Sequence, residues 1–324
     1  DQDGDDAGIV IVCGNRSGGK TTGFLLCALM LWCKYKLKFI LIYRYSYEIG
    51  AANEIFYDIL AQYPIFGKEM ATKPQAKGLF YNILLDDVSC GFSISLNNVD
   101  GLKKYSPIFK DCYFCVMDEM STESGKYLTK ELDKLQSILI SISRGGGKQS
   151  KEMKLCLLSN KISLVNPYFI GFGISKKIKK DTKILHGSGY VVEFNYTESS
   201  SRAINENKLL KAFRESNYVK AMSSDTYLLD DSIFIQKPTG KSKYIFTFIF
   251  NGEKFGVWNY FEENYIYVTT KIDNNFPIVI ALKPSDHNQY TLMLDKYDYL
   301  FQNIKNAYEK GFLRAWGAIK VNQN

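Results

Sequence analysis

The feature that most constrains this chain is the segment GNRSGGKT, from Gly14 to Thr21, near its N-terminus. An apolar run, Ile9 to Val12, precedes it, and a helix-like stretch, Phe24 to Trp32, follows it. A glycine-rich turn that joins a strand to a helix and ends in Lys and Thr fits the phosphate-loop pattern GxxxxGK(S/T) in the context that the pattern requires. A chance glycine turn is the alternative, and the agreement of pattern and context disfavours it.

Each residue type in this loop has a chemical reason. Glycines let successive backbone N–H groups turn toward phosphate oxygens, and the N-terminus of the following helix adds partial positive charge. Lys20 would neutralise the β- and γ-phosphate oxygens, and Thr21 would ligate Mg²⁺. The loop therefore predicts a site for a nucleoside triphosphate with Mg²⁺, formed by Gly14, Asn15, Arg16, Ser17, Gly18, Gly19, Lys20, Thr21 and Thr22.

A second signal is the apolar strand CYFCVM, which delivers two carboxylates, Asp118 and Glu119, at its end. Asp118 can hold Mg²⁺ through water, and Glu119 is placed to orient and deprotonate an attacking water. Carboxylates at a strand end can also serve only to solvate an edge, but this is seldom their role when a phosphate loop accompanies them. A Glu directly after the Asp favours hydrolysis over phosphoryl transfer, which argues against a small-molecule kinase.

Two further polar residues are candidates for the same site. Asn160 ends the strand KLCLLSN and can sense the γ-phosphate, but from spacing alone a turn-capping Asn is an equally good interpretation. Arg144 follows the helix predicted over Lys130 to Ile142 and precedes three glycines. It can reach a neighbouring subunit's nucleotide and stabilise transition-state charge, or it can be an exposed helix end favoured by the helix dipole. The residues by themselves favour the second interpretation of Arg144.

The composition is that of a globular protein large enough for two domains, with 324 residues and 46% hydrophobic side chains. The longest apolar stretch, Gly23 to Cys33, is too short to cross a bilayer, so we expect a buried helix and no membrane association. No targeting segment is visible, and because the chain begins at Asp1 rather than Met we expect a trimmed N-terminus. A net charge of +7 is compatible with a polyanionic partner, and the runs SRGGGKQSK and SKKIKKDTK are its clearest local sources.

All seven cysteines lie in the first half of the chain, mostly within apolar patterns, and we expect buried, reduced thiols. Cys112 and Cys115 form a CxxC pair, but the pair alternates as a strand does, and no second pair follows. Because the chain has only two histidines, a zinc site is disfavoured, and core packing is favoured over redox catalysis.

Alternating apolar strands and helical stretches up to about Asn195 predict a parallel α/β sheet. The strands expected there are Gly8–Cys13, Lys38–Tyr43, a hairpin of Leu79–Leu85 with Phe92–Leu96, Tyr113–Met117, Lys154–Leu158 and Tyr190–Phe194. Helical periodicity also marks Ile55 to Tyr63, and a Ser-rich stretch after the sheet leads into a linker or lid helix. A second α/β domain follows, with a meander of Lys243–Phe250, Lys254–Tyr260, Tyr265–Thr270 and Phe276–Leu282 and a closing helix from Met293 to Tyr308.

Several longer motifs resemble the double-stranded DNA packaging (encapsidation) ATPases of phi29-like podoviruses, small relatives of the terminase large subunits. The matching segments follow the family's order through nearly the whole chain: GNRSGGKT, FILIYRY, VMDE, LLSNKISLVNPYF and KYIFTFIFNGEKFGVW. The last two segments are far more specific than a phosphate loop alone.

The resemblance implies a fold of three parts. Residues 1–196 would form a P-loop ATPase domain of the additional-strand, catalytic-glutamate (ASCE) class, 197–228 a helical linker, and 229–324 a small RNase H-like α/β domain. It also implies a homopentameric ring in the host cell cytoplasm, transiently docked on the portal of a viral procapsid, that pumps double-stranded DNA inward. Contacts to DNA phosphates would make DNA binding independent of sequence, and whether a packaging RNA lies between ATPase and portal is left open.

The family's functional residues carry over to the matching positions. The resemblance implies that Lys20 and Thr21 bind ATP and Mg²⁺, that Asp118 is the Walker B carboxylate, and that Glu119 is the catalytic base. It makes Arg144 a finger that acts on a neighbouring subunit's nucleotide. Weaker candidates are Lys103 and Lys104 for that contact between subunits, and Lys148, Lys151 and Lys176 to Lys180 for DNA.

The second domain lacks the acidic pattern of a nuclease. An RNase H-like nuclease holds two metal ions with carboxylates, one of them from its first strand, and the segment Tyr244 to Phe250 reads YIFTFIF. We therefore predict a domain without nuclease activity that binds DNA or the portal. The neighbouring acidic residues lie in flanks and turns: Asp230, Asp231, Glu253, Glu262 and Glu263. A packaging terminase with an active nuclease and a nucleotide-gated assembly factor without translocation are the alternatives.

Overall fold

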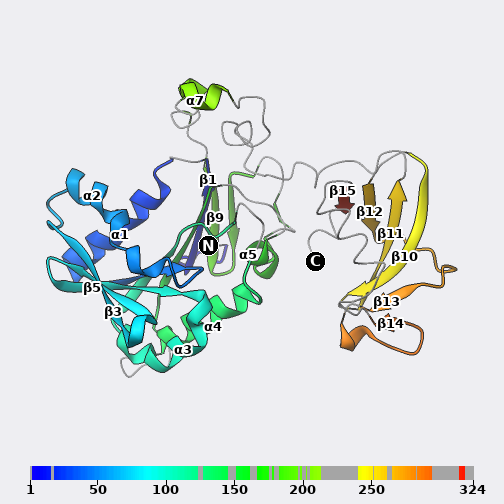
Figure 1. Ribbon diagram of the computed structural model, residues 1–324, viewed down its shortest axis with the longest axis horizontal. Helices are drawn as coiled ribbons and strands as arrows, with labels where there is room; N and C mark the ends of the chain where they lie inside the picture. The colour runs from blue at the N-terminus through cyan, green and yellow to red at the C-terminus, as the bar shows by residue number, and fades with distance from the viewer. Residues whose placement is uncertain are drawn as a thin grey trace. The chain divides into compact units, whose positions relative to one another are not determined.

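The computed structural model describes residues 2–15, 18–122, 127–144, 151–160, 166–174, 177–178, 182–195, 198, 202, 205–212, 240–250, 252–260, 265–281, 283–293 and 314–317. The chain divides into two compact units, one of Asp1–Gly171 with Lys177–Leu229 and one of Phe172–Lys176 with Asp230–Asn324 (Figure 1). Each unit has its own sheet.

The first unit is built on a mixed nine-stranded sheet in the order β3-β4-β5-β2-β6-β7-β1-β9-β8. Its strands are β1 (Ile9–Gly14), β2 (Lys38–Tyr43), β3 (Met70–Gln75), β4 (Phe80–Leu85), β5 (Val88–Ser95), β6 (Cys112–Met117), β7 (Lys154–Ser159), β8 (Ile184–Gly187) and β9 (Tyr190–Asn195). The strands from β5 to β9 in this order run parallel, and β3, β4 and β8 pair antiparallel at the edges. The expected parallel sheet is therefore correct only for the centre.

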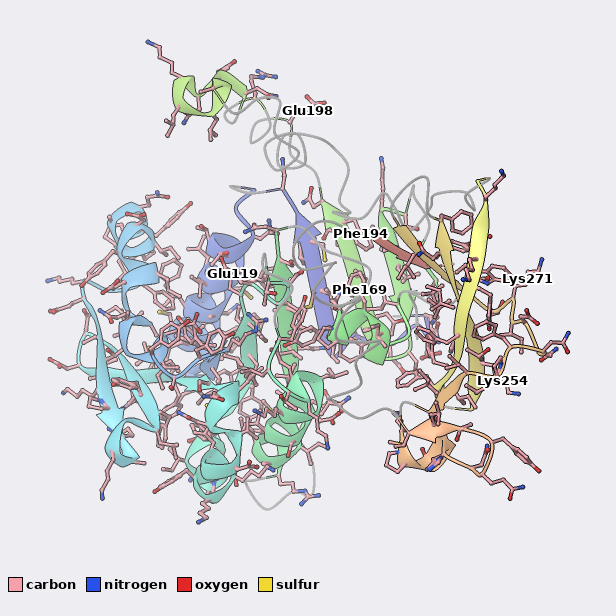
Figure 2. The ribbon with its side chains drawn as sticks, turned by 45° about the vertical axis from the view of Figure 1, so that its right-hand side comes forward. Glu119, Phe169, Phe194, Glu198, Lys254 and Lys271 are labelled. Atoms are coloured by element: carbon pink, nitrogen blue, oxygen red, sulfur yellow. The ribbon has the colours of Figure 1, made fainter. Side chains whose placement is uncertain are left out.

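Helices cover this sheet and complete its core (Figure 1). They are α1 (Lys20–Tyr35), α2 (Tyr57–Gln62), α3 (Val99–Leu102), α4 (Glu131–Ser143) and α5 (Pro167–Gly171), with short 3₁₀ turns at Ile49–Ala51, Glu54–Phe56, Ala76–Gly78, Leu96–Asn98 and Lys103–Phe109. The same unit also contains the short helix α7 (Lys208–Lys211). The side chains of Leu25, Leu29 and Trp32 on α1 pack into one core cluster with Phe39 of β2. Phe169 of α5 meets Phe194 of β9 with ring centroids 6.2 Å apart (Figure 2).

The order of the neighbouring strands β6, β7 and β1 decides which loops meet at one edge of the sheet. β7 pairs with β1 on one side and with β6 on the other, all parallel. The carboxyl ends of these strands therefore lie at one edge of the sheet, where open α/β sheets bind their ligands. This edge receives the phosphate loop after β1, the acidic pair after β6 and Asn160 after β7.

Some expected elements of the first unit are wrong or incomplete. The helix expected from Ile55 to Tyr63 is a 3₁₀ turn, Glu54–Phe56, followed by the short α2. The strands β3 and β8 were not expected from the sequence, because β3 is mostly exposed and contains Pro74, and β8 is only four residues long. Pro74 is tolerated because β3 is the edge strand of the sheet.

The second unit contains a six-stranded sheet in the order β14-β13-β10-β11-β12-β15. Its strands are β10 (Ser242–Phe250), β11 (Glu253–Tyr260), β12 (Tyr265–Thr269), β13 (Val279–Ala281), β14 (Leu292–Met293) and β15 (Arg314–Gly317), with a 3₁₀ turn at Pro284–Asp286. The first three strands form the expected antiparallel meander, but β13 pairs parallel to β10 on the other side. Of the closing helix expected from Met293 to Tyr308, Met293 belongs instead to β14, and the remaining residues lie outside the described part of the chain.

No helix within the described residues combines the length and the apolar character needed to cross a lipid bilayer.

Candidate active site

Two glycines of the phosphate loop are required by the backbone around them. Gly14, the last residue of β1, pairs with Asn195 of β9, and a Cβ on Gly14 would lie 2.3 Å from the Asn195 backbone oxygen. Gly19 precedes α1 with a φ of +74°, a left-handed conformation that glycine adopts without steric cost. Arg16 and Ser17 of the loop lie outside the described residues.

Lys20, the first residue of α1, is held over the loop by two acceptors. Its Nζ donates to the Asn15 backbone oxygen at 2.8 Å and to the Asn160 Oδ1 at 3.2 Å. Burial lowers the pKa of Lys20, and the nearby Asp118 carboxylate opposes that effect. The contact with Asn160 joins the phosphate loop to the end of β7, as a role for Asn160 in sensing phosphate would require.

Thr21 and Asp118 come together from distant parts of the sequence. The Thr21 Oγ1 donates to the Asp118 Oδ2 at 2.7 Å, and the Asp118 side chain is exposed. A hydroxyl and a carboxylate are oxygen donors of the kind that Mg²⁺ prefers, with water and phosphate oxygens completing the shell. The residues present therefore fit a Mg²⁺ ion. The neighbouring Thr22 is exposed in the first turn of α1, and Gly18 is half-buried.

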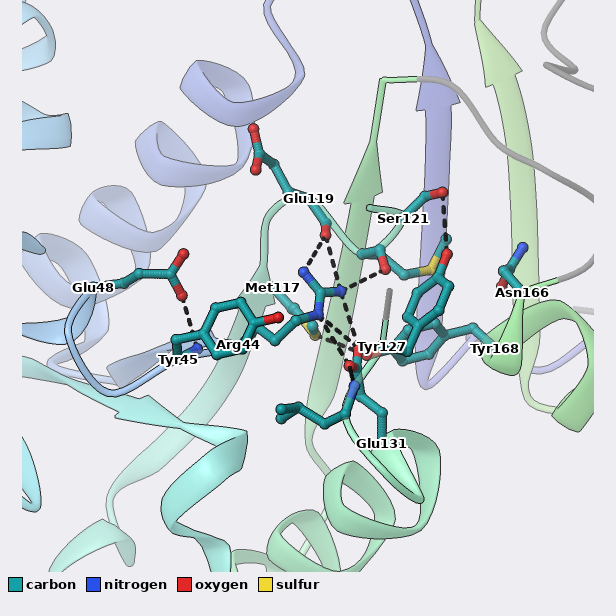
Figure 3. A network of polar contacts seen from close by, with 12 residues as sticks. Arg44, Tyr45, Glu48, Met117, Glu119, Ser121, Tyr127, Glu131, Asn166 and Tyr168 are labelled. Carbon is teal, nitrogen blue, oxygen red and sulfur yellow. Dashed lines mark hydrogen bonds and ion pairs between the residues drawn. The ribbon is translucent and has the colours of Figure 1, made fainter. Parts of the chain in front are cut away.

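Glu119 follows β6 in an unusual backbone conformation, with a φ of +52°. Its backbone N–H donates to the Asp118 Oδ1 at 2.8 Å, and its own side chain is exposed. Its backbone oxygen accepts hydrogen bonds from both terminal nitrogens of Arg44, at 3.2 and 3.3 Å. Figure 3 shows that the Glu119 carboxylate points away from the Arg44 side chain. The backbone, not the carboxylate, is therefore what Arg44 holds.

Arg44 belongs to a buried polar cluster that the sequence did not reveal as part of the site. Arg44, the residue after β2, forms a 2.9 Å ion pair with Glu131, the first residue of α4. The Tyr168 hydroxyl donates to the Glu131 Oε1 at 2.7 Å (Figure 3). Arg44 and Tyr168 stand in two of the family-like segments, FILIYRY and NPYF, and this was the only signal for them. Glu131 gave no signal, because an acidic residue in the first turn of a helix is ordinary.

The residues considered for contacts between subunits lie at the surface. Arg144 directly follows α4 and is exposed. Lys103 and Lys104 are exposed as well, and Lys103 pairs with Asp100 at 3.2 Å. An exposed arginine at the end of α4 is accessible to a neighbouring subunit, and its role there stays a prediction.

Lys151 does not suit the expected contact with DNA. Its side chain is 8% exposed, and its Nζ donates to the backbone oxygens of Phe109 at 3.0 Å and Lys110 at 2.6 Å. An ammonium group engaged in this way is not available to a phosphate, so this expectation is wrong. Lys177 is exposed, whereas Lys148, Lys176, Lys179 and Lys180 lie outside the described residues.

The cysteines are all free thiols, and most of them are core residues. Cys112 and Cys115 are both buried on β6, which confirms core packing of the CxxC pair. The expectation of burial is wrong for Cys27, which is exposed on α1, and only partly correct for Cys33, which is half-buried. Within the described part of the chain, no three His, Cys, Asp or Glu side chains are arranged to hold a metal ion.

Comparison with known proteins gives one family for nearly the whole chain. The sequence model of the Podovirus DNA encapsidation protein (Gp16) family matches residues 5–322. The DNA packaging protein of Bacillus phage PZA is 25% identical over 308 residues, 94% of this chain and 88% of the relative's length. The DNA packaging protein of Bacillus phage phi29 is 24% identical over the same coverage.

Solved structures share the fold at low sequence identity. A chain of the bacteriophage Phi-29 viral genome packaging motor assembly has a TM-score of 0.60 and 21% identity, and the match covers 96% of this chain and 91% of that one. A chain of the Phi-28 gp11 DNA packaging motor has a TM-score of 0.58 and 16% identity, covering 98% of this chain and 93% of that one. Both chains therefore share the fold of this protein.

Proposed function

Since the chain belongs to the Podovirus DNA encapsidation protein (Gp16) family, we propose that its phosphate loop and the acidic end of β6 form the ATP-hydrolysing centre of a packaging motor. As a member of this family, the chain is a DNA packaging motor ATPase of the phi29-like type. The observation that carries the proposal is the 2.7 Å hydrogen bond between Thr21 and Asp118, with Lys20 and Asn160 joined beside it. This is where the γ-phosphate of ATP and its metal ion would be bound.

The residues divide the chemistry between them. Lys20 neutralises charge on the β- and γ-phosphates, and the loop amides orient the triphosphate. Thr21 and Asp118 would hold Mg²⁺, which, when bound, withdraws charge from the phosphate oxygens. Glu119 accepts a proton from the attacking water. Asn160 hydrogen bonds Lys20 and is placed to respond when the γ-phosphate leaves.

Several features support a finer assignment of fold and assembly. The position of β7 between β1 and β6 supports the ASCE class of P-loop ATPase. We propose a homopentameric ring in which Arg144 completes the neighbouring subunit's site. The ring would dock on the portal of a procapsid in the host cytoplasm and bind double-stranded DNA through its phosphates. We also propose that residues 197–228 form a helical linker. The short helix α7, which the Asn207 side chain caps, supports this linker.

The second unit would serve as a binding module rather than a nuclease. Its strand β10 carries no carboxylate, and the described Glu253 is exposed at the start of β11. Two-metal cleavage needs several carboxylates around one point. Incubation with plasmid DNA and Mn²⁺ tests this, and intact plasmid is the expected result, whereas nicking that is lost with a second-unit carboxylate would restore the nuclease hypothesis.

The test of the ATPase centre is hydrolysis measured against protein concentration, with and without double-stranded DNA. Glu119→Gln is expected to lower the rate about 10²–10⁴-fold, because it removes the general base, and Arg144→Ala about 10³-fold or more. Mixing these two inactive variants should restore activity, because each supplies the group that its neighbour lacks. Glu152→Gln, a change of the same chemistry at an exposed site, is the control and should behave as the parent.

Two results would contradict this assignment. Hydrolysis that does not depend on protein concentration and survives Arg144→Ala would mean a site complete within one subunit, which would favour a nucleotide-gated assembly factor. Hydrolysis at the parent rate in Glu119→Gln would remove the catalytic base from Glu119.

A further inference from the structure

The carboxylate of Glu131 is buried and saturated with donors, although it lies outside the nucleotide site. Glu131 is 1% exposed, Tyr168 is fully buried and Arg44 is 8% exposed. The Glu131 carboxylate accepts from the Arg44 Nε at 3.0 and 3.1 Å, from an Arg44 terminal nitrogen at 2.9 Å, and from the Tyr168 hydroxyl at 2.7 Å. It also accepts from the Leu128 backbone N–H at 2.8 Å.

The Arg44 guanidinium, which binds Glu131, also faces the backbone of the loop that follows β6 and carries Glu119 (Figure 3). Its terminal nitrogens donate to the backbone oxygens of Glu119, at 3.2 and 3.3 Å, and of Met120, at 2.9 Å. The Met120 backbone N–H donates to the Leu158 oxygen of β7 at 2.8 Å. The loop that carries Glu119 is thus tied to Arg44 on one side and to β7 on the other.

We propose that Glu131 is a positioning residue for hydrolysis, acting through Arg44 to hold the backbone of Glu119 in its left-handed conformation. This rests on the role of Glu119 as the base in the proposed function. Tyr168 fixes the Glu131 carboxylate, Glu131 orients the guanidinium fork of Arg44, and that fork holds two consecutive backbone oxygens. The direction of the Glu119 side chain, and with it the position of the attacking water, follows from that backbone.

Physical chemistry gives two reasons why this cluster does more than stabilise the fold. A buried ion pair gains little stability over a well-packed apolar pair, because both charges lose their hydration. A non-glycine residue disfavours positive φ, so the conformation of Glu119 needs neighbours that impose it. Arg44 meets that need because its planar fork offers five donors in a fixed geometry, which lysine cannot reproduce.

The test replaces both Arg44 and Glu131 with apolar residues. It asks whether the rate of ATP hydrolysis falls while the protein still folds and binds ATP. Arg44→Met/Glu131→Leu removes the ion pair without leaving a charge buried alone, so the variant is expected to fold. We expect its kcat to fall about a hundredfold, as misplacement of a catalytic group by about 1 Å can do, while KM for ATP and the affinity for a fluorescent ATP analogue stay unchanged. Tyr168→Phe, which removes one hydroxyl, should lower kcat several-fold with the same split between kcat and KM.

A second comparison separates positioning from a structural role. In a Glu119→Gln background the loss of Arg44 and Glu131 should cause no further decrease in the residual rate, because the cluster acts through Glu119. The control is Asp6→Asn, which breaks the exposed 2.9 Å ion pair between Asp6 and Lys154 and should leave kcat unchanged.

Three results would overturn the proposal. The first is parent-level kcat in Arg44→Met/Glu131→Leu, or in Tyr168→Phe if the double variant does not fold. The second is an equal fall of the rate in the parent and Glu119→Gln backgrounds, which is what a structural role predicts. The third is parent-level hydrolysis by Glu119→Gln, which would overturn the base assignment as well, whereas the first two leave that assignment intact.

Discussion

At Glu119 the backbone takes a conformation that most side chains avoid. A left-handed conformation costs a non-glycine residue about 1–2 kcal/mol, and Glu119 adopts one with a φ of +52°. The carbonyl hydrogen bonds from Arg44 offset this, since a hydrogen bond to a charged group contributes about 1.5–3 kcal/mol. Breaking the pair at one partner would cost about 3–5 kcal/mol, because the other charge would stay buried. The stability and the geometry of the site therefore depend on the same side chain.

Asn160 gives the sharpest single-residue prediction, because its Oδ1 accepts a hydrogen bond from Lys20 although Asn160 is not part of the phosphate loop. We expect Asn160→Ala to lower the hydrolysis rate about tenfold or more, since the hydrogen bond of its Oδ1 to a charged ammonium is lost. ATP affinity should change much less, because the Lys20 Nζ keeps its 2.8 Å bond to the Asn15 oxygen. Steady-state kinetics and titration with a fluorescent nucleotide measure the two quantities separately.

The opposite outcome for Asn160 is equally clear. Equal loss of affinity and rate would mean that Asn160 only holds Lys20 in place. Parent-level hydrolysis would make Asn160 a turn residue at the end of β7, the alternative that spacing alone could not exclude. Asn288→Ala, in the second unit, is a control of the same chemistry and should have no effect on either quantity.

At the scale of elements, the sequence predicted what local patterns determine. The apolar run before the phosphate loop, the run KFILIY and the run before Asp118 are buried strands β1, β2 and β6, because a central parallel strand is apolar on both faces. The polar edge strand β3 has no such signal. The parallel pairing of β13 with β10 could not be predicted, since a chain reversal in a meander and a crossover leave similar local patterns.

The residues of the site also differ in whether a local sequence pattern predicts them. The phosphate loop and the Asp-Glu pair are local motifs, and their residue types predicted that Thr21 and Asp118 serve the same Mg²⁺ ion. The structure brings these two side chains together. The cluster of Arg44, Glu131 and Tyr168 joins three segments that are distant in sequence, and each residue has an ordinary local explanation. The prediction that Lys151 contacts DNA was wrong for a related reason. A charged run predicts a surface lysine, and the backbone oxygens that accept from Lys151 come from a segment distant in sequence.

The buried thiols of the central strands predict an alkaline loss of stability. Burial raises the pKa of Cys90, Cys112 and Cys156 to about 12 in the folded chain, against an ordinary value of 9.0. Between these values the unfolded chain loses protons that the folded chain retains. The free energy of unfolding therefore falls as pH rises, by at most about 1.4 kcal/mol per pH unit for each thiol.

This stability is fully present below about pH 9, near the ordinary thiol pKa, and is lost as pH rises toward 12. Urea unfolding at pH 8 and pH 10 measures it, and the midpoint should be lower at pH 10. Cys112→Ala should reduce the difference between the two midpoints, whereas the same change at the exposed Cys27 should reduce it less. Equal midpoints at both pH values in the parent would show that these thiols do not titrate differently in the two states.

At the scale of the whole molecule, charge is the property that bears on DNA. The chain carries a net charge of +7, and its lysines differ in what they can contact. Lys151 binds backbone oxygens inside the first unit, while Lys177 is exposed within the run SKKIKKDTK. Only exposed lysines can neutralise DNA phosphates. The number of lysines in a basic sequence run is therefore larger than the number of phosphate contacts that the run can make.

The last prediction follows from phosphate contact as the mode of DNA binding. The affinity for double-stranded DNA, measured with a non-hydrolysable ATP analogue present, should fall linearly with salt on logarithmic axes, with a slope of about −0.9 for each phosphate contacted. Two DNA fragments of unrelated sequence should give the same slope and affinities within about threefold, because phosphates carry no sequence information. Lys177→Gln should reduce the slope by about one if this lysine contacts DNA, and Lys68→Gln, at another exposed lysine, is the matched control. Affinities that differ more than about tenfold between the fragments would instead indicate contacts to base edges, each worth about 1–3 kcal/mol.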